Sequence, residues 1–165
     1  MTVAGNGQAG FSGDGGLATN ASLNYPQGLA VDSGGNLFIA DMVNARVRRV
    51  DASSRVITTV AGNGQIESPN DGAHAKNASL IRPYDVAFDR SGNLFIADYG
   101  SVRRVAASGI ITTVAGSGEY GFGGDNGPAI EARIDVTRLA FDGAGNLYIS
   151  DRLNHRVRAV RGPIP

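Results

Sequence analysis

A glycine-rich stretch near the N-terminus, Gly5-x-Gly7-x-x-Gly10, has the spacing of a dinucleotide-binding loop. It follows a short β-branched segment, and Asp32 lies at a suitable distance downstream to bind a ribose. Such a loop must open a helix at once, because the pyrophosphate binds the free N–H groups at the helix N-terminus. Here residues 11–16 continue as FSGDGG, a composition typical of a loop, and the stretch recurs at residues 59–64 and 113–118. We therefore predict that the chain binds no nicotinamide, flavin or other cofactor.

Single aspartates in three similar loops raise the question of calcium binding: Asp14, Asp71 and Asp125. Calcium takes six to eight oxygen ligands, and one carboxylate among glycines falls well short of that number. Each aspartate precedes an alanine-rich stretch with apolar residues at helical spacing, so we predict that it caps a single helical turn. His74 and His155 lack the converging partners that a metal ligand or a general base needs. The sequence thus predicts no metal site and no catalytic residue.

Three further aspartates, Asp32, Asp89 and Asp142, each begin a short turn that contains glycine and ends in asparagine. An aspartate in this place accepts hydrogen bonds from backbone N–H groups about two residues on, and Gly35 tolerates the positive φ that such a turn requires. We therefore predict a structural role for all three.

Polar residues that follow the apolar segments form a second candidate set. Asp41 with Asn44 and Arg46, and Asp151 with Asn154 and Arg156, lie close enough in sequence to form a loop network, and Asp98 is their counterpart in the middle repeat. We expect such packing and pairing, with a ligand-facing role as the alternative.

Arginine alternates with apolar residues in the third segment of each repeat, which predicts that these segments lie nearer to solvent. The arginines could form a phosphate-binding rim or pair with aspartates, and the balanced net charge favours pairing. They are Arg48, Arg49, Arg103, Arg104, Arg156 and Arg158.

Composition is that of one globular domain: 165 residues, 42% apolar and 18% charged. The 24 glycines indicate many tight turns between short strands, hence an all-β fold. Lys plus Arg equals Asp plus Glu at 15 each, so no net field favours nucleic acid or an anionic membrane. The absence of cysteine excludes disulfides and thiolate sites and leaves the compartment open. We expect no membrane span and no signal peptide.

The chain is a threefold repeat, in which GLAVDSGGNLFIAD, DVAFDRSGNLFIAD and RLAFDGAGNLYISD align. The repeats run roughly over residues 2–57, 58–111 and 112–165 of a single domain. In the first, residues 28–31, 37–40, 46–50 and 56–61 predict four antiparallel strands, the first two buried on both faces. A repeat of this kind cannot bury its apolar surface alone, and its radial polarity is typical of a propeller blade.

Residues 26–47 carry the pattern P-x-G-L-A-V-D-x-x-G-N-L-F-I-A-D-x-x-N-x-R-V, which resembles the NHL repeat. The connecting loops resemble long-loop versions common in bacterial proteins. The resemblance covers essentially the whole chain and implies a β-propeller, usually of six blades. The second repeat lacks two residues after Asp98, and the third has Val136 in place of Pro26, so loop geometry can differ there.

We expect a non-enzymatic scaffold or binding module that presents its long loops to a protein or other ligand. The loops from strand four to strand one and from strand two to strand three emerge on one face, and the former, at about twenty residues, have a length associated with function. The candidate binding face comprises Phe11, Met42, Glu67, Tyr99, Glu119, Tyr120, Phe122, Arg138, Arg152 and His155, with Val43, Gln65, Ile66 and Leu153 beside them.

Two alternatives come from resemblance to other propellers. A six-bladed lyase or lactonase holds a metal in its central channel, and in the innermost strands of this chain only Asp85 and Arg138 offer suitable polar side chains. Single-stranded RNA binding on the loop face needs a basic, aromatic surface, for which Arg82, Arg138 and Arg152 give weak support. Fold alone does not decide among these functions.

Three blades cannot close a ring, and an open half exposes apolar surface and strand edges. Thr2, Val3 and Ala4 read as a fourth strand, whereas the last repeat ends on a third strand with Arg156, Val157, Arg158 and Val160. We therefore predict a homodimer in which the N-terminal strand of each copy completes the last blade of the other, closing six blades about a twofold axis.

Overall fold

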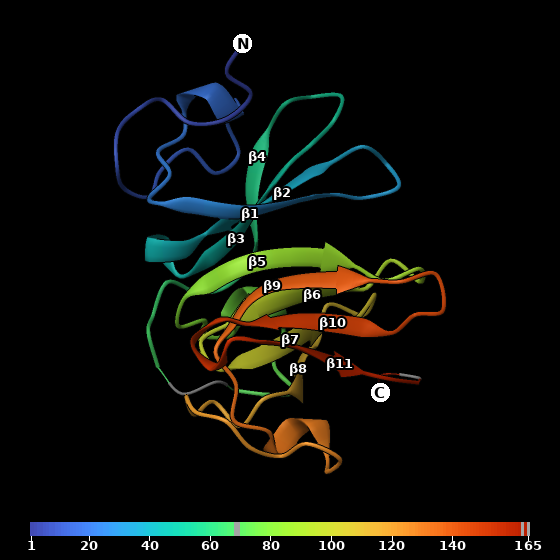
Figure 1. The fold of residues 1–165 in the computed structure, drawn as a ribbon. Helices are drawn as coiled ribbons and strands as arrows, with labels where there is room; N and C mark the ends of the chain where they lie inside the picture. The colour runs from blue at the N-terminus through green and yellow to red at the C-terminus, as the bar shows by residue number, and fades with distance from the viewer. Residues whose placement is uncertain (68–69, 163, 165) are drawn as a thin grey trace.

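The computed structural model describes residues 1–67, 70–162 and 164, and over these residues the chain forms three antiparallel sheets (Figure 1). Two sheets have four strands and the third has three. The first contains β1 (Pro26–Val31), β2 (Leu37–Asp41), β3 (Arg46–Val50) and β4 (Ile57–Ala61). The second contains β5 (Pro83–Phe88), β6 (Leu94–Asp98), β7 (Ser101–Val105) and β8 (Ile111–Ala115). The third contains β9 (Val136–Phe141), β10 (Leu147–Asp151) and β11 (Arg156–Val160).

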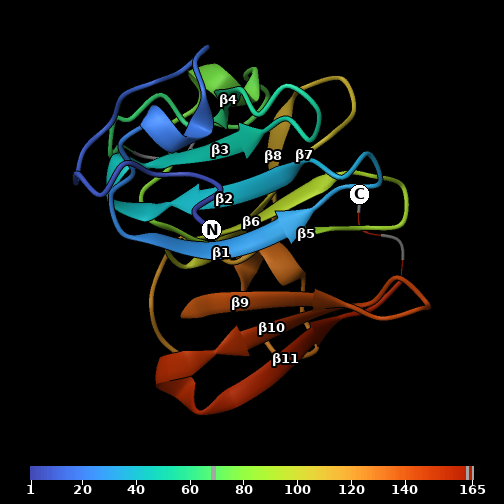
Figure 2. The ribbon, with the colours of Figure 1, turned by 90° about the horizontal axis from the view of Figure 1, so that it is seen from above.

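Within each sheet the strands lie in chain order, as in a propeller blade, and we call the sheets blades 1, 2 and 3. The innermost strands β1, β5 and β9 are neighbours, and the blades fan out from them (Figure 2). The all-β, propeller-like architecture predicted from the repeats is therefore confirmed. In the described part of the chain, no helix is long and apolar enough to cross a membrane.

The apolar core lies between successive blades, where facing sheets pack together. Leu29 and Val31 of β1 remain exposed, so the prediction that the first two strands are buried on both faces is wrong for β1. Phe38, Ala40 and Val47 of blade 1 pack against Leu80 and Ile96 at blade 2. The same positions of blade 2, Phe95, Ala97 and Val102, pack against Ile134, Leu147 and Ile149 at blade 3.

The turn between the first two strands of each blade is held by its aspartate, as predicted. Asp32 Oδ1 accepts hydrogen bonds from the N–H groups of Gly34 and Asn36 at 2.9 Å, and Gly35 has a φ of 80°. The Asn36 side chain donates to Asp32 Oδ2 at 2.8 Å. Asp89 and Asp142 repeat this arrangement with Asn93 and Asn146.

The prediction that the third strands lie near solvent is wrong for blades 1 and 2. The Arg48 and Arg103 side chains are fully buried, because the loop that precedes each blade folds over its third strand and supplies a carboxylate. An alternation of arginine with valine is typical of an exposed strand, and the sequence pattern alone does not reveal a covering loop.

The predicted helical turns exist as three single 3₁₀ turns, η1 (Ala18–Asn20), η3 (Ala75–Asn77) and η4 (Ala129–Glu131). The aspartates do not cap them, so that part of the prediction is wrong. Leu17, His74 and Pro128 occupy the N-cap positions. Asp14 instead accepts hydrogen bonds from the Arg48 side chain and from the Thr59 N–H.

Among the residues that the structure describes, Thr2, Val3 and Ala4 pair with no strand. The two residues that follow this segment nevertheless make the same backbone hydrogen bonds as the two residues that follow β4 and β8. Gly5 N–H and Asn6 N–H donate to Ala18 and Ala21, as Gly62 and Asn63 donate to Ala75 and Ala78.

Candidate functional site

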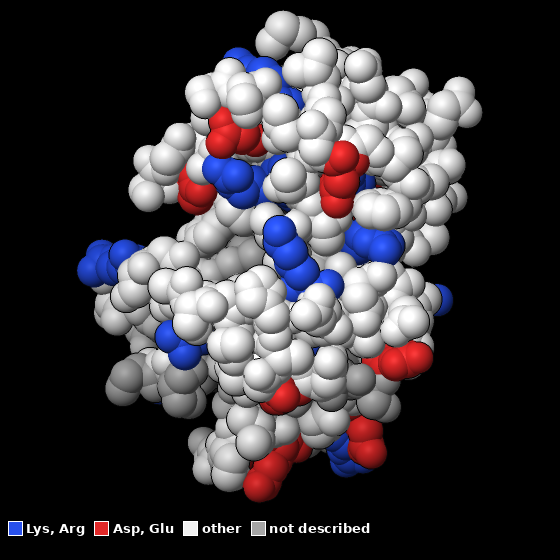
Figure 3. Space-filling view, turned by 180° about the vertical axis from the view of Figure 1, so that it is seen from behind, with Lys and Arg blue, Asp and Glu red and all other residues white. Residues whose placement is uncertain are grey.

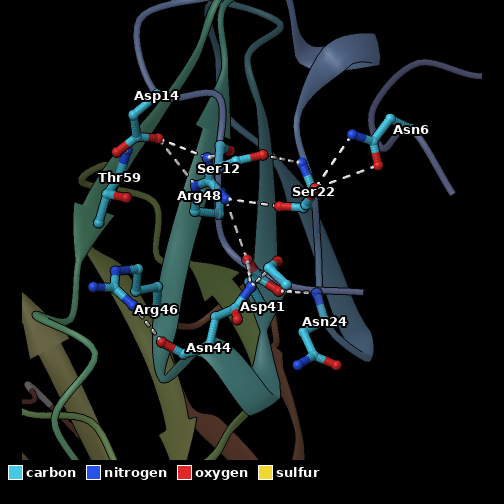
Figure 4. A network of polar contacts seen from close by, with 11 residues as sticks. Asn6, Ser12, Asp14, Ser22, Asn24, Asp41, Asn44, Arg46, Arg48 and Thr59 are labelled. Carbon is cyan, nitrogen blue, oxygen red and sulfur yellow. Dashed lines mark hydrogen bonds and ion pairs between the residues drawn. The ribbon is translucent and has the colours of Figure 1, made fainter. Parts of the chain in front are cut away.

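The long loops are tied to the blades by a buried ion-pair network, shown for blade 1 in Figure 4. The Arg48 guanidinium donates to Asp14 Oδ1 at 2.7 Å and to Asp41 Oδ2 at 3.3 Å. Arg48 and Asp41 are both fully buried, so each charge depends on the other for solvation. Burial raises the pKa of Asp14, but hydrogen bonds from Thr59 and Arg48 outweigh it and hold the pKa below its usual range.

The carboxylate at the end of each second strand positions the segment that enters the same blade. Asp41 Oδ1 accepts from Asn24 N–H at 2.7 Å, Asp98 from Ile81 and Arg82, and Asp151 from Asp135 N–H at 2.8 Å. Burial raises the pKa of Asp98, against these hydrogen bonds. These aspartates are therefore structural, as their predicted packing role requires.

Asparagine joins the two kinds of loop on one face of the molecule. Asn44 Nδ2 donates to Asp41 at 2.8 Å and to the Gly10 carbonyl at 2.8 Å. Asn154 does the same with Asp151 and Gly121. The loops from strand four to strand one thus lie beside the loops from strand two to strand three, as the face prediction requires.

Two predicted face residues, Phe11 and Phe122, hold equivalent places in the loops before blades 1 and 3. The guanidinium of Arg46 lies 3.8 Å from the Phe11 ring centroid, and that of Arg156 lies 4.0 Å from the Phe122 ring. Both rings are less than half exposed. The Phe11 and Phe122 rings stack on these arginines by cation–π contact, so they stabilise the loops as well as forming part of the surface.

A tyrosine cluster lies over the junction of blades 2 and 3. The ring centroids of Tyr99 and Tyr120 are 4.3 Å apart, and Tyr84 adjoins Tyr120. Burial and the neighbouring Tyr84 raise the pKa of Tyr120 well above its usual range, so its hydroxyl stays protonated. The Tyr120 hydroxyl can therefore donate a hydrogen bond at this junction.

The corresponding junction of blades 1 and 2 carries an apolar pocket of about 300 Å³. It is lined by Tyr25, Met42, Val43, Ile66, Ile81 and Arg82. Tyr25 and Ile66 are more than half exposed, and Val43 is 47% exposed. Contiguous exposed apolar surface on a loop face is typical of an interaction site.

Sequence reasoning did not single out Tyr25, whose φ of 51° lies in the left-handed region. An aromatic residue adopts this conformation at a cost of roughly 1–2 kcal/mol, and here the flanking hydrogen bonds enforce it. Asn24 N–H donates to Asp41, and Val43 N–H donates to the Asn24 carbonyl at 3.1 Å. A tyrosine before Pro26, at the position of Arg82 and Asp135 in the other repeats, was the available signal.

The remaining predicted face residues are scattered over this surface. Glu67, Glu119 and His155 are exposed. Arg152 Nε donates to the buried Asp135 at 3.1 Å, so part of its charge is neutralised. Arg138 lies on the innermost strand β9 and donates to the Tyr84 carbonyl at 3.2 Å.

Asp85, considered for a central metal, is largely buried in the innermost strand β5. Its Oδ2 accepts from Leu139 N–H at 2.9 Å, and a Cβ at Gly28 would collide with its carboxyl group. Burial raises the pKa of Asp85 despite this hydrogen bond. The side chain thus links blade 2 to both neighbours, and among the described residues no group of three or more His, Asp or Glu could hold a metal ion.

Basic and acidic side chains lie interspersed on the face seen from behind, without a continuous basic area (Figure 3). The glycine-rich loop at residues 5–10 uses its N–H groups within the fold, since Gly5, Asn6 and Gly10 all donate to backbone carbonyls. This geometry differs from a phosphate-binding loop, whose N–H groups must be free.

The family model of the teneurin NHL domain matches residues 5–70 and 63–123. Teneurin-1 of Mus musculus is 31% identical over 109 residues, which are 63% of this chain and 4% of that protein. NHL repeat-containing protein 2 of Bos taurus is 35% identical over 78 residues, 47% of this chain and 11% of that protein. The chain thus spans a small part of these relatives, which are animal proteins, so the likeness of the loops to bacterial proteins does not indicate a source.

Solved structures of low identity share the fold. A protein of unknown function from Bacteroides thetaiotaomicron VPI-5482 has a TM-score of 0.72 at 20% identity, covering 87% of this chain and 37% of that one. An auxiliary nutrient binding protein from Bacteroides ovatus has a TM-score of 0.68 at 24% identity, covering 87% of this chain and 38% of that one. A luciferin-regenerating enzyme has a TM-score of 0.51 at 19% identity, covering 79% of this chain and 38% of that one.

The family match extends over well more than half of the sequence, and its two matched segments contain blades 1 and 2. The chain therefore belongs to the NHL-repeat family of β-propeller domains, as represented by the teneurin NHL domain.

Proposed function

We propose that this chain is a non-enzymatic binding module whose long-loop face holds an apolar side chain of a protein ligand. The observation that carries the proposal is the pocket between blades 1 and 2, where Tyr25 and Val43 remain exposed on segments fixed by the Asp41 network. Ile66, from the loop after β4, adds a third exposed side chain to the same pocket. A preorganised apolar pocket loses little conformational entropy on binding, which favours affinity.

A matched pair of substitutions tests this proposal. Ile66→Ser removes an exposed isoleucine from the pocket, and Ile130→Ser removes one from η4, outside the pocket. Peptides selected from a random phage library on the immobilised protein would be titrated calorimetrically into each variant. We expect Ile66→Ser to weaken binding about tenfold with an unchanged melting temperature, and Ile130→Ser to leave both unchanged. Equal affinity of the recovered peptides for all three proteins would contradict the proposal.

Enzymatic activity of the lyase or lactonase kind is the alternative to this proposal, since an enzyme is among the similar structures. We do not favour it because the Asp85 carboxylate, the acidic side chain considered for a central metal, is engaged by Leu139. Calorimetric titration with Ca²⁺, Mg²⁺ and Zn²⁺ tests this point, and we expect no saturable binding. RNA binding is also not favoured, because Arg152 is paired with Asp135.

We further propose that two copies close a six-bladed ring. The support is the exposed apolar side of each end blade: Leu29 and Val31 at blade 1, and Tyr148 and Val157 at blade 3. Light scattering coupled to size exclusion should report about twice the chain mass of 17.0 kDa. A stable monomer at micromolar concentration would refute the closure.

A further inference from the structure

The outer edge of β11 borders a groove of about 800 Å³, and residues 156–161 of blade 3 line it. The groove is lined by β11, by residues 124–127 of the preceding loop, and by Ala115, Ile134 and Ile149 beneath. In the described residues no strand pairs with this edge of β11. In blades 1 and 2 the corresponding place is filled by β4 and β8, which pair with β3 and β7.

In blades 1 and 2 the loop aspartate binds a backbone N–H of this fourth strand. Asp14 bridges Arg48 and the N–H of Thr59, with distances of 2.7 and 3.1 Å. Asp71 bridges Arg103 and the N–H of Thr113, at 2.8 and 2.9 Å.

In blade 3 the arginine half of the same bridge is formed. Asp125 Oδ1 lies 2.6 Å from Arg158, and Asp125 Oδ2 has no backbone donor within the described part of the chain. A carboxylate in this position accepts the N–H of a strand threonine in both other blades, so Asp125 is positioned to accept one as well.

The N-terminal segment has the matching sequence and geometry. Thr2-Val3-Ala4-Gly5 repeats the residues Thr59-Val60-Ala61-Gly62 and Thr113-Val114-Ala115-Gly116. Ala4 packs against the cluster that contains Ala18 and Ala21, just as Ala61 packs with Ala75 and Ala78. The segment is therefore already anchored as the end of a fourth strand, with its strand residues unpaired.

In the described structure the N-terminal segment and the edge of β11 are not in contact. The N-terminal segment lies beside blade 1 at one end of the array, and β11 forms the edge at the other end (Figure 1). The occupant that fits the groove in sequence and in anchoring is therefore the same segment of a second copy.

We propose that Asp125, with Arg158 and the edge of β11, is a strand-binding site that takes Thr2, Val3 and Ala4 of a second copy. This inference rests on the proposed homodimer. Thr2 N–H donates to Asp125 Oδ2, and the register follows from blade 1, where Val47 pairs with Ala61 and Arg48 with Thr59. Ala4 then lies opposite Val157, and Thr2 opposite Arg158.

Disulfide trapping tests the register, since the chain has no cysteine of its own. Ala4→Cys protein is mixed with Val157→Cys protein under mild oxidation. We expect a linked species of about twice 17.0 kDa on a non-reducing gel, formed in the mixture and from neither variant alone. The control is Ala159→Cys mixed with Ala4→Cys, where the diagonal separation of roughly 7–8 Å exceeds disulfide reach and little linkage should form.

The outcomes separate this inference from the homodimer itself. A dimer by light scattering without Ala4–Val157 linkage would overturn the strand site and leave a homodimer of another kind. A monomer would overturn both. Linkage through Ala159 equal to that through Val157 would overturn the register.

A second pair of variants tests the aspartate. Asp125→Ala should raise the dimer dissociation constant at least about tenfold, because a charge-assisted contact to the incoming strand is lost. Asp71→Ala makes the same change in blade 2, where the fourth strand belongs to the same chain and neither junction is involved, and should leave the dissociation constant unchanged. Equal effects of the two substitutions on dissociation would contradict the assignment.

Discussion

Blades 2 and 3 have almost the same sequence pattern but differ in what covers them. Val102 in β7 is fully buried, whereas Val157, at the same repeat position in β11, is 74% exposed. Phe95 is 1% exposed and its counterpart Tyr148 is 38% exposed. The repeat therefore specifies a blade, and the neighbouring blade decides whether its apolar face is buried. The strands β9, β10 and β11 of blade 3 match β5, β6 and β7 of blade 2, but in the described structure no neighbouring blade packs on the exposed side of blade 3.

The largest effect is expected from the buried arginine of a completed blade. Arg48→Met leaves Asp41 buried without its cation, so the free energy of unfolding should fall by about 3–5 kcal/mol. Arg158→Met should cost less in dilute protein, because Asp125 is more than half exposed and because Arg158 lies 3.7 Å from the buried Asp151, farther than the 3.3 Å between Arg48 and Asp41. Urea denaturation at several protein concentrations measures both. A cost below about 1 kcal/mol for Arg48→Met would contradict the structural role of the network.

The same substitution at matched positions compares the two blades more directly. Val102→Ala should cost about 2–3 kcal/mol, from lost apolar burial and the cavity that remains. Val157→Ala should cost less than about 0.5 kcal/mol at concentrations where the chain is monomeric. At concentrations where the ring forms, its cost should approach that of Val102→Ala. Chemical denaturation over a range of concentrations distinguishes these cases, and a concentration-independent small cost would show that Val157 stays exposed.

Asp85 ties blade 2 to both neighbours, and its titration gives a smaller effect. Because burial raises its pKa in the folded state, its contribution to stability is greatest below about pH 3.8 and falls as the pH rises through the folded value. Asp85→Asn keeps an oxygen that accepts the hydrogen bond from Leu139 N–H, and it removes the loss of stability that ionisation of a buried carboxyl group causes. We expect the variant to be at least as stable as the parent at pH 7, and the difference to shrink on acidification. A variant that is less stable at pH 7 would mean that the charge itself is needed.

The exposed turn of blade 3 should show the smallest effect. A hydrogen bond from the Asn146 side chain, together with backbone N–H bonds, lowers the pKa of Asp142 to about 2. Its stabilising contribution is therefore complete above pH 3.8, the ordinary pKa of an aspartate, and is lost as the pH falls toward 2. Asp142→Asn should flatten this part of the pH profile, measured by melting temperature. An unchanged slope between pH 4 and pH 2 would contradict the assignment.

Most of the fold can be predicted from the sequence, because the same pattern of strands and turns occurs in all three repeats. The alignment on Asp32, Asp89 and Asp142 places the hairpin turns, and the apolar segments place the strands. The burial of Arg48 and Arg103 does not follow, because it depends on a loop that returns over the third strand from about thirty residues away. The same contact explains why Asp14 binds an arginine rather than a helical turn.

The candidate site was predictable only in part. Variation among the loops indicates the face, and Met42, Val43 and Ile66 do line a common pocket. Phe11 and Phe122 belong partly to the frame, because each covers an arginine whose position the sequence does not reveal. Tyr25 was missed because its importance lies in a backbone conformation, which residue type does not encode.

Hydrogen exchange of the β11 backbone, compared with β3 and β7, tests most directly whether another chain completes blade 3. If the N-terminal segment of a second copy pairs with β11, its edge amides should be protected as well as those of β3 and β7 at high protein concentration. Their protection should fall on dilution or when residues 1–4 are deleted. Rapid exchange of the β11 edge at every concentration, with β3 and β7 protected, would contradict the account.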